Sequence, residues 1–398
     1  MSQPGTPAST AAVLRPPGQF ALNEEQVAIR DLALEFAADK LAPDAIAWDR
    51  EKFFPREVIR SAASLGFGGI AVAEDVGGSA LSRLEGVLIY DSLATGCPCI
   101  SAYFSVHNMV ASVIDRFGTP EQRKRWLPRM CALELLGAIC LTEPTSGSDA
   151  ASLSTQAVRC PDGYKLTGVK QFISGGGEAD IYLVMARTGE PGPRGVSAFI
   201  VEKGTQGLSF GQPEKKMGWN AQPTCQVILD EAIVPAENML GAEGSGFKIA
   251  MSALDGGRLN IAACSLGGAR AALNKATAYM KERTAFGHPI ADFQALQFRV
   301  ADMATDIEVI QTFLWRAASA LDAGDPNATV LCAMAKRYLT DAGFNVANEA
   351  LQLFGGYGYL ADYGVEKIVR DLRVHQILEG TNEIMRVIIA RSVLASAR

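Results

Sequence analysis

The 398-residue sequence is poor in the residues that build metal sites and disulfide frameworks. Its three histidines, His107, His288 and His375, lie far apart in the chain. Its eight cysteines are scattered and form no C-x-x-C pair; the nearest two are Cys97 and Cys99. This spacing argues against a compact zinc motif and favours a reduced compartment without disulfides. A metal site assembled from the distant histidines stays an open alternative.

Excess positive charge and long apolar runs are also missing. Lys and Arg number 37 against 43 Asp and Glu, so the net charge of −6 predicts no general basic face for nucleic acid. No apolar run approaches the roughly 20 residues that cross a bilayer, so we expect no membrane partner. Residues 1–20 contain one Arg and no long apolar core, which is a poor secretory signal. We expect this segment to be disordered and the protein to be bacterial and cytoplasmic.

What the chain does contain is enough apolar sequence for two or three domains, with 48% hydrophobic and 20% charged residues. Residues 21–136 are predicted to be helical, with cap signals at Asn23–Gln26 and at Thr119–Gln122. Residues 137–245 hold short β-rich runs between Gly/Pro turns, which predicts a sandwich or barrel.

Helical periodicity returns after Gly246, and residues 246–398 are predicted to form a bundle from segments near 247–282, 292–322, 327–354 and 382–396. The predicted fold class is therefore α+β, mainly α, with a helical domain, a β domain and a C-terminal four-helix bundle.

The most informative segment is DLRVHQILEGTNEIMR, residues 371–386. Glu379 lies in a bend between Ile377–Leu378 and Gly380, where partial desolvation raises a carboxyl pKa toward the range of a general base. Thr381 or Asn382 can cap the following helix. Taken alone, Glu379 is better explained as a solvated turn residue, because a Glu before Gly is usually one.

Five further segments accompany it in a fixed order: ICLTEPTSGSDAAS (139–152), VKQFISGGGEADIYLVMA (169–186), LDGGRLN (254–260), RTAFGHPIADFQALQF (283–298) and LQLFGGYGYL (351–360). Together with Glu379 they resemble the acyl-CoA dehydrogenase family over nearly the whole chain, from about Leu22 to Val393. The resemblance implies helical, β and helical domains in that order. In eukaryotes this family is located in mitochondria, so a eukaryotic source would imply the mitochondrial matrix.

The resemblance implies α,β-dehydrogenation of an acyl-CoA thioester, with Glu379 as the base and FAD as hydride acceptor. A minority of the family carries the base immediately before the Arg of D-x-x-R. That position is Gly257 here, which leaves Glu379 as the base.

The resemblance also assigns binding residues. The FAD residues would be Ile139, Cys140, Leu141, Thr142, Gly147, Ser148, Phe172, Ile173, Ser174, Arg283, Phe293, Gln294, Gln352, Leu353, Phe354, Gly355, Gly356, Thr381, Asn382 and Glu383. The acyl-CoA residues would be Ser148, Asp255, Gly256, Gly257, Arg258, Gly380 and Arg391. In the family, Arg283 and the 352–356 strip serve the FAD of a neighbouring subunit, so a homotetramer is expected.

Two positions depart from the pattern. Thr145 replaces the commoner Gly of E-P-x-S-G-S-D, and Asp255 stands where the isobutyryl branch often has Asn. Four segments of this chain nevertheless resemble the isobutyryl branch: LATGCPC, KKMGWNAQPT, VADMAT and VRDLRVHQILEGTNEIMR.

We therefore expect isobutyryl-CoA as substrate, in valine catabolism, with electron-transfer flavoprotein as acceptor. The alternatives are a 2-methylbutyryl-, butyryl- or isovaleryl-CoA dehydrogenase, an oxygen-using acyl-CoA oxidase, and a non-catalytic acyl-CoA-binding scaffold.

Overall fold

The computed structural model describes residues 21–396, so the prediction of disorder for residues 1–20 lies outside the described residues. The N-terminal part is helical: α1 (Glu24–Phe36), α2 (Ala45–Glu51), α3 (Arg56–Ser61), α4 (Arg83–Gly96), α5 (Pro98–Phe117) and α6 (Pro120–Cys131). Both predicted caps are confirmed as capping boxes, Asn23 with Gln26 and Thr119 with Gln122. A third box, which the sequence analysis did not predict, begins α4 and joins Ser82 to Glu85.

The middle part is a sheet built from β1 (Gly137–Cys140), β2 (Gln156–Cys160), β3 (Gly163–Ser174), β4 (Ile181–Arg187), β5 (Val196–Glu202), β6 (Leu208–Phe210), β7 (Thr224–Val234) and β8 (Met239–Leu240). The strand order is β6-β7-β3-β2-β4-β5-β8, and β1 pairs in parallel with β4. The long β3 and β7 pair antiparallel and break register between Lys170 and Ile173.

The C-terminal part consists of α7 (Gly246–Glu282), a hairpin of β9 (Thr284–Ala285) and β10 (His288–Pro289), α8 (Gln294–Asp322), α9 (Ala328–Leu353), α10 (Val365–Arg373) and α11 (Asn382–Ser396). The four helical segments predicted from periodicity are α7, α8, α9 and α11. The short α10 was not among them.

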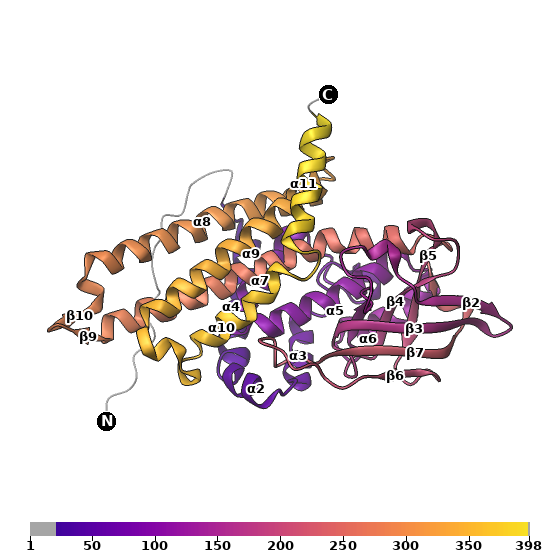
Figure 1. Ribbon diagram of the computed structural model, residues 1–398, viewed down its shortest axis with the longest axis horizontal. Helices are drawn as coiled ribbons and strands as arrows, with labels where there is room; N and C mark the ends of the chain where they lie inside the picture. Colours follow the sequence, from indigo (N-terminus) through magenta and orange to yellow (C-terminus); the bar gives the residue numbers. More distant parts are fainter. Residues whose placement is uncertain (1–20, 397–398) are drawn as a thin grey trace.

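Helix α7 connects the two ends of the molecule. Its 37 residues span about 55 Å, from the sheet at its start to the β9–β10 hairpin at its end (Figure 1). It packs against α4, α5, α8 and α9, and the C-terminal end of α11 projects away from the other helices (Figure 1).

The contact between α7 and α4 is very close, because a Cβ at Gly267 would lie 2.0 Å from the Asp91 carbonyl oxygen. Small residues on α7 thus bring α4 and α5 against the same helix that meets the Glu379 bend. The fold class is confirmed as mainly α, with N-terminal helical, middle β and C-terminal helical parts.

Candidate active site

Glu379 lies in a tight bend between α10 and α11. The N–H groups of Ile377 and Leu378 both donate to the Val374 carbonyl, at 2.9 and 3.1 Å. Glu379 then adopts a left-handed backbone with φ 55°, followed by Gly380 with φ 89°. The Thr381 hydroxyl accepts from the Ile384 N–H at 3.3 Å, as predicted for a cap of the next helix. The bend thus fixes the backbone from which the carboxylate projects.

The Glu379 carboxylate rests on the backbone of α7. A Cβ at Gly257 would lie 2.1 Å from its Oε2, so only a glycine leaves room for this position. Oε2 is buried and has no hydrogen-bond partner among residues 21–396. Burial raises the pKa of Glu379 to about 7, against the opposing effect of the Lys336 and Arg258 cations. A carboxyl with this pKa can accept a proton near neutral pH.

Lys336 on α9 anchors the bend from inside the protein. It is fully buried, and its Nζ donates to the Gly380 carbonyl at 2.8 Å and to Asn382 Oδ1 at 2.9 Å. The Asn382 amide in turn donates to Thr340 Oγ1 at 2.9 Å and to Asp341 Oδ1 at 2.8 Å. Asn382 is one of the residues predicted to complete the cofactor site, and its side chain takes part in this network.

The Lys336 network was missed by the sequence analysis. Its only local signal is a pair of polar residues, Lys336 and Thr340, spaced four apart on an otherwise apolar face of a helix. That spacing is equally common on solvated helix faces, so it did not single them out.

The predicted acyl-CoA residues of α7 lie beside the carboxylate. Arg258 Nη1 pairs with Asp255 Oδ1 at 2.6 Å, and Asp255 also accepts from Thr329 Oγ1 at 2.7 Å. Gly256 and Gly257 complete the α7 surface next to Glu379, and Gly380 lies in the same bend. Arg391 and Glu383 are exposed on α11.

The two strips predicted to line the flavin ring are adjacent. The Gln171 N–H of β3 donates to the Thr142 carbonyl at 2.8 Å, which ties the end of β3 to the loop after β1. Beneath this contact Lys170 Nζ pairs with Glu143 Oε1 at 2.7 Å, and both side chains are buried. Glu143 also accepts from the backbone N–H groups of Ser154 and Thr155.

The loop shape tolerates the substitution at position 145. Thr145 is exposed in a turn closed by two hydrogen bonds between Glu143 and Ser146, and its φ is not positive. A glycine is therefore not required there, and Gly147 and Ser148 follow on the exposed side of the same loop.

Phe172 is presented to solvent by the break in register of β3. Its φ is 60° and its side chain is 64% exposed, although it lies within a strand. An aromatic ring held outward next to the Thr142 strip fits a planar ring ligand. The flanking Cys140 and Ile173 side chains are buried in the β core, so a ligand here would meet their backbone.

The remaining predicted FAD residues form a separate groove. Arg283, at the end of α7, lies over the Tyr357 ring at 5.5 Å, beside a cavity of about 430 Å³ lined by Tyr279, Leu353 and the 354–357 turn. Gln352 begins this strip, and Phe293 and Gln294 lie where α8 starts. Leu353 and Phe354 have buried side chains below it. Arg283 has no carboxylate partner in the described chain, which suits a phosphate ligand.

This groove is remote from Glu379 in the same chain. Arg283 follows Gly257 by 26 residues of nearly continuous helix, about 39 Å along α7. A single flavin dinucleotide does not bridge that distance. The predicted residues thus lie in three places: the contact of Glu379 with α7, the adjacent β1–β3 strips, and the groove around Arg283, which is far along α7 from the first.

Two kinds of feature are absent from the part of the chain that the structure describes. No group of three or more His, Cys, Asp or Glu side chains forms a candidate metal site within residues 21–396. No described helix is both long enough and apolar enough to cross a membrane.

Comparison with known proteins establishes the family. Sequence profiles of the acyl-CoA dehydrogenase N-terminal, middle and C-terminal domains match residues 23–134, 138–232 and 244–394. The chain belongs to the acyl-CoA dehydrogenase family and is an FAD-dependent oxidoreductase acting on CH–CH bonds. The resemblance carried by the motifs is thereby confirmed.

Two relatives are isobutyryl-CoA dehydrogenases, described as mitochondrial. That of Bos taurus is 55% identical over 373 residues, and that of Dictyostelium discoideum is 53% identical over 373 residues. Each alignment covers 94% of this chain and 90% of the relative. The solved structure of butyryl-CoA dehydrogenase from Megasphaera elsdenii is 40% identical, with a TM-score of 0.92, and the match covers 95% of this chain and all of that one.

Proposed function

We propose that this enzyme dehydrogenates a short branched-chain acyl-CoA, isobutyryl-CoA in valine catabolism, with Glu379 as the base. The observation that carries the proposal is the Glu379 carboxylate: it rests on Gly257, its Oε2 is unpaired in the described structure, and its pKa is raised to about 7. The identity of the acyl group is supported by the 55% and 53% identical relatives.

The proposed proton transfer starts from the ionised carboxylate. Glu379 Oε2 removes the α proton of the thioester and holds it as a neutral acid, which is the form that burial favours. Lys336 and Arg258 oppose this effect, and their positive charges keep a working fraction of Glu379 ionised at neutral pH. The bend thus gives Glu379 a pKa high enough to hold the α proton, while part of the carboxyl stays ionised and able to accept it.

The developing negative charge on the thioester oxygen requires a donor. The backbone N–H of Glu379 donates to no group in residues 21–396, and it belongs to the residue that carries the base. A free N–H held in a fixed left-handed bend is preorganised for this purpose, and such donors are often worth two to three orders of magnitude in rate, about 3–4 kcal/mol. We assign it as one donor to the thioester carbonyl.

FAD, when bound, supplies the acceptor for the hydride that leaves the β carbon. The residues that would hold it are the backbone of Leu141–Thr142, the Phe172 ring and the Ser174 hydroxyl near its flavin ring. Arg283 and the Gln352–Gly356 strip of a neighbouring subunit would hold its phosphates and adenosine. Because Arg283 lies about 39 Å along α7 from Gly257, which contacts the base, the proposal requires an oligomer, and we infer a homotetramer that passes electrons to electron-transfer flavoprotein.

The experiment that tests the base is Glu379→Gln. The amide preserves size but cannot take the α proton, so FAD and acyl-CoA should still bind while the rate falls by roughly three or more orders of magnitude. Bleaching of the flavin by substrate at a near-normal rate would refute the assignment.

A panel of acyl-CoA substrates with a dye acceptor tests the acyl group. We expect the highest kcat/KM for isobutyryl-CoA, with 2-methylbutyryl- and isovaleryl-CoA, which are one carbon larger, lower by roughly 10–200-fold. Butyryl-CoA, the straight-chain isomer, should also be a poorer substrate. A clear preference for octanoyl-CoA would reject the short-chain proposal. Slow reoxidation of the reduced flavin by air separates a dehydrogenase from an oxygen-using oxidase.

A further inference from the structure

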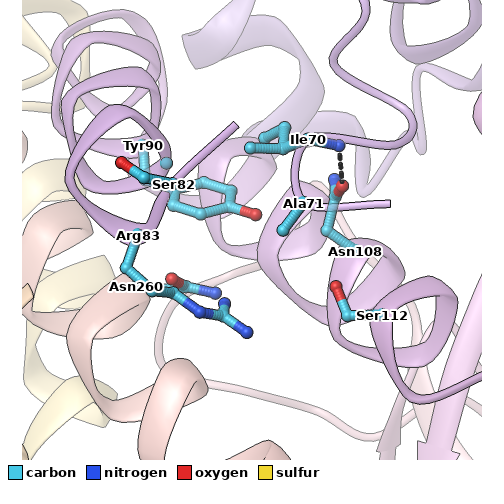
Figure 2. Close-up of a pocket in the computed structure, with 9 residues that line it drawn as sticks. Ile70, Ala71, Ser82, Arg83, Tyr90, Asn108, Ser112 and Asn260 are labelled. Carbon is cyan, nitrogen blue, oxygen red and sulfur yellow. Dashed lines mark hydrogen bonds between the residues drawn. The ribbon is translucent and has the colours of Figure 1, made fainter. Parts of the chain in front are cut away.

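A small cavity lies between α4, α5 and α7 (Figure 2). Its volume of about 10 Å³ is room for one water molecule. Its walls include four polar side chains that converge on the space: Arg83 and Tyr90 from α4, Ser112 from α5 and Asn260 from α7 (Figure 2). None of these four residues was predicted from the sequence to be functional.

These polar groups have no partner within the described chain. Tyr90 is 2% exposed and Asn260 is 3% exposed, yet neither the phenol hydroxyl nor the amide makes a hydrogen bond to another described residue. The same is true of the Arg83 guanidinium and the Ser112 hydroxyl. These polar atoms face the cavity, so a water or a ligand atom placed there is the partner open to them.

Asn108, on the same wall, shows the contrast. Its amide accepts from the Ile70 N–H at 2.8 Å and donates to the Phe67 and Phe104 carbonyls at 2.8 and 3.0 Å. Asn108 therefore holds the fold together, whereas Tyr90 and Asn260 direct unused donors into the cavity (Figure 2).

The cavity borders the proposed catalytic centre. A Cβ at Gly256 would lie 2.8 Å from Arg83 Nη1, and a Cβ at the next residue, Gly257, would lie 2.1 Å from Glu379 Oε2. Asn260 follows Gly256 by four residues and so lies on the same face of α7. An acyl chain that leaves Glu379 and follows this part of α7 would reach these donors, and the subsite requires that path.

The charges beside the cavity favour an anion. Arg258 is paired with Asp255 at 2.6 Å, and Lys336 is held by the Gly380 carbonyl next to Glu379. Arg83 has no carboxylate partner in residues 21–396, although it is only partly exposed. A half-buried guanidinium beside three neutral donors matches a carboxylate oxygen better than a methyl group.

We propose that Arg83, Tyr90 and Asn260 form a subsite for a carboxylate at the end of a short acyl chain, so that the enzyme also binds CoA monothioesters of short dicarboxylic acids. The proposal rests on the proposed function, because it takes acyl-CoA as the ligand and Glu379 as the base. One carboxylate oxygen takes the place available to a single water, and a methyl group placed there leaves the donors unsatisfied.

The test is a set of binding titrations, followed by flavin absorbance, on FAD-loaded Glu379→Gln enzyme, which prevents turnover. Each carboxylated thioester is compared with the analogue in which an isopropyl group replaces the carboxylate: succinyl-CoA with 4-methylpentanoyl-CoA, and glutaryl-CoA with 5-methylhexanoyl-CoA. We expect the carboxylated member of at least one pair to bind about tenfold or more tightly. Adding Arg83→Met should abolish this preference, and adding Arg50→Met, at an exposed arginine, should not.

Tyr90→Phe removes one hydroxyl and reduces the preference even if Arg83→Met fails to fold. Equal affinity within both pairs overturns the subsite. A carboxylate preference that is unchanged in Arg83→Met, or in Tyr90→Phe if only that variant folds, also overturns it. The wild-type enzyme is assayed separately with isobutyryl-CoA. A carboxylate preference without isobutyryl-CoA oxidation would reject the proposed substrate and leave the subsite standing.

Discussion

Replacing Gly257 by Ala separates the position of the catalytic carboxylate from the stability of the fold. The new Cβ would lie 2.1 Å from Glu379 Oε2, 2.9 Å from its Cδ and 3.0 Å from Met109 Cε. All three atoms are at the ends of flexible side chains, so the backbone of α7 can stay in place. The carboxylate must retreat by at least 1.3 Å, from 2.1 to 3.4 Å, to reach ordinary contact distance.

The two effects of this substitution have opposite signs. Ala in place of Gly inside a helix stabilises it by about 0.5–1 kcal/mol, which offsets the cost of moving two side-chain ends. A displacement of about 1 Å at a reacting group, in contrast, can lower the rate by about 100-fold. We therefore expect a Tm near that of the wild type, retained FAD, and a loss of about two orders of magnitude in the rate of flavin reduction measured by stopped flow.

A double-mutant cycle provides the control. Glu379→Asp shortens the side chain by one methylene and withdraws the carboxylate from Gly257, so adding Gly257→Ala to it should cost little further rate. If the two losses simply add, or if Gly257→Ala alone reduces flavin at the wild-type rate, the contact between Gly257 and Glu379 does not position the base.

Three further outcomes are expected. Arg283→Ala should weaken FAD retention and subunit assembly together, because a cofactor shared between subunits links the two equilibria; a stable, FAD-replete monomer in light scattering would contradict this. Lys336→Met removes a cation that lowers the pKa of Glu379, so the acidic limb of the kcat/KM profile should move to higher pH. Thr340→Val disturbs Asn382 without changing charge and should leave the acidic limb in place. An unmoved limb in Lys336→Met counts against the electrostatic role of Lys336. Burial lowers the pKa of His107 to about 4 and that of His375 to about 3, so the folded state binds fewer protons, and each histidine should lower the stability by up to about 1.4 kcal/mol per pH unit as the pH drops from 6.5 toward 4. Urea unfolding of Glu379→Gln measures this without the opposite contribution of Glu379, whose raised pKa makes stability fall as the pH rises; a flat profile would exclude the effect.

The order of elements could be predicted because its signals are local. The boxes at Asn23 and Thr119 involve residues three positions apart, and the helical period resumes at Gly246, where α7 begins. The short α10 was missed because nine residues give too little periodicity. The division into domains after residues 136 and 245 stays a prediction.

The site could be predicted only as far as its motifs reach. Glu379 and the α7 glycines could be predicted from their motifs, and the fold brings them together. The contact of Lys336 with Gly380, 44 residues away, and the cavity shared by Tyr90 and Asn260 could not be predicted, because such contacts depend on how helices pack. The outward position of Phe172 depends on a break in strand register. The assigned FAD and acyl-CoA residues stay predictions.

The left-handed backbone of Glu379 has a consequence for evolution and for engineering. An L-residue at φ 55° costs about 1–2 kcal/mol relative to a glycine at the same place, so Glu379→Gly relieves strain, and it also removes a carboxylate that burial penalises. A screen for thermal stability alone would therefore tend to enrich changes at position 379, and the variants it selected would be robust, well folded and inactive. Libraries built on this scaffold should hold residue 379 fixed, or select for turnover together with heat resistance.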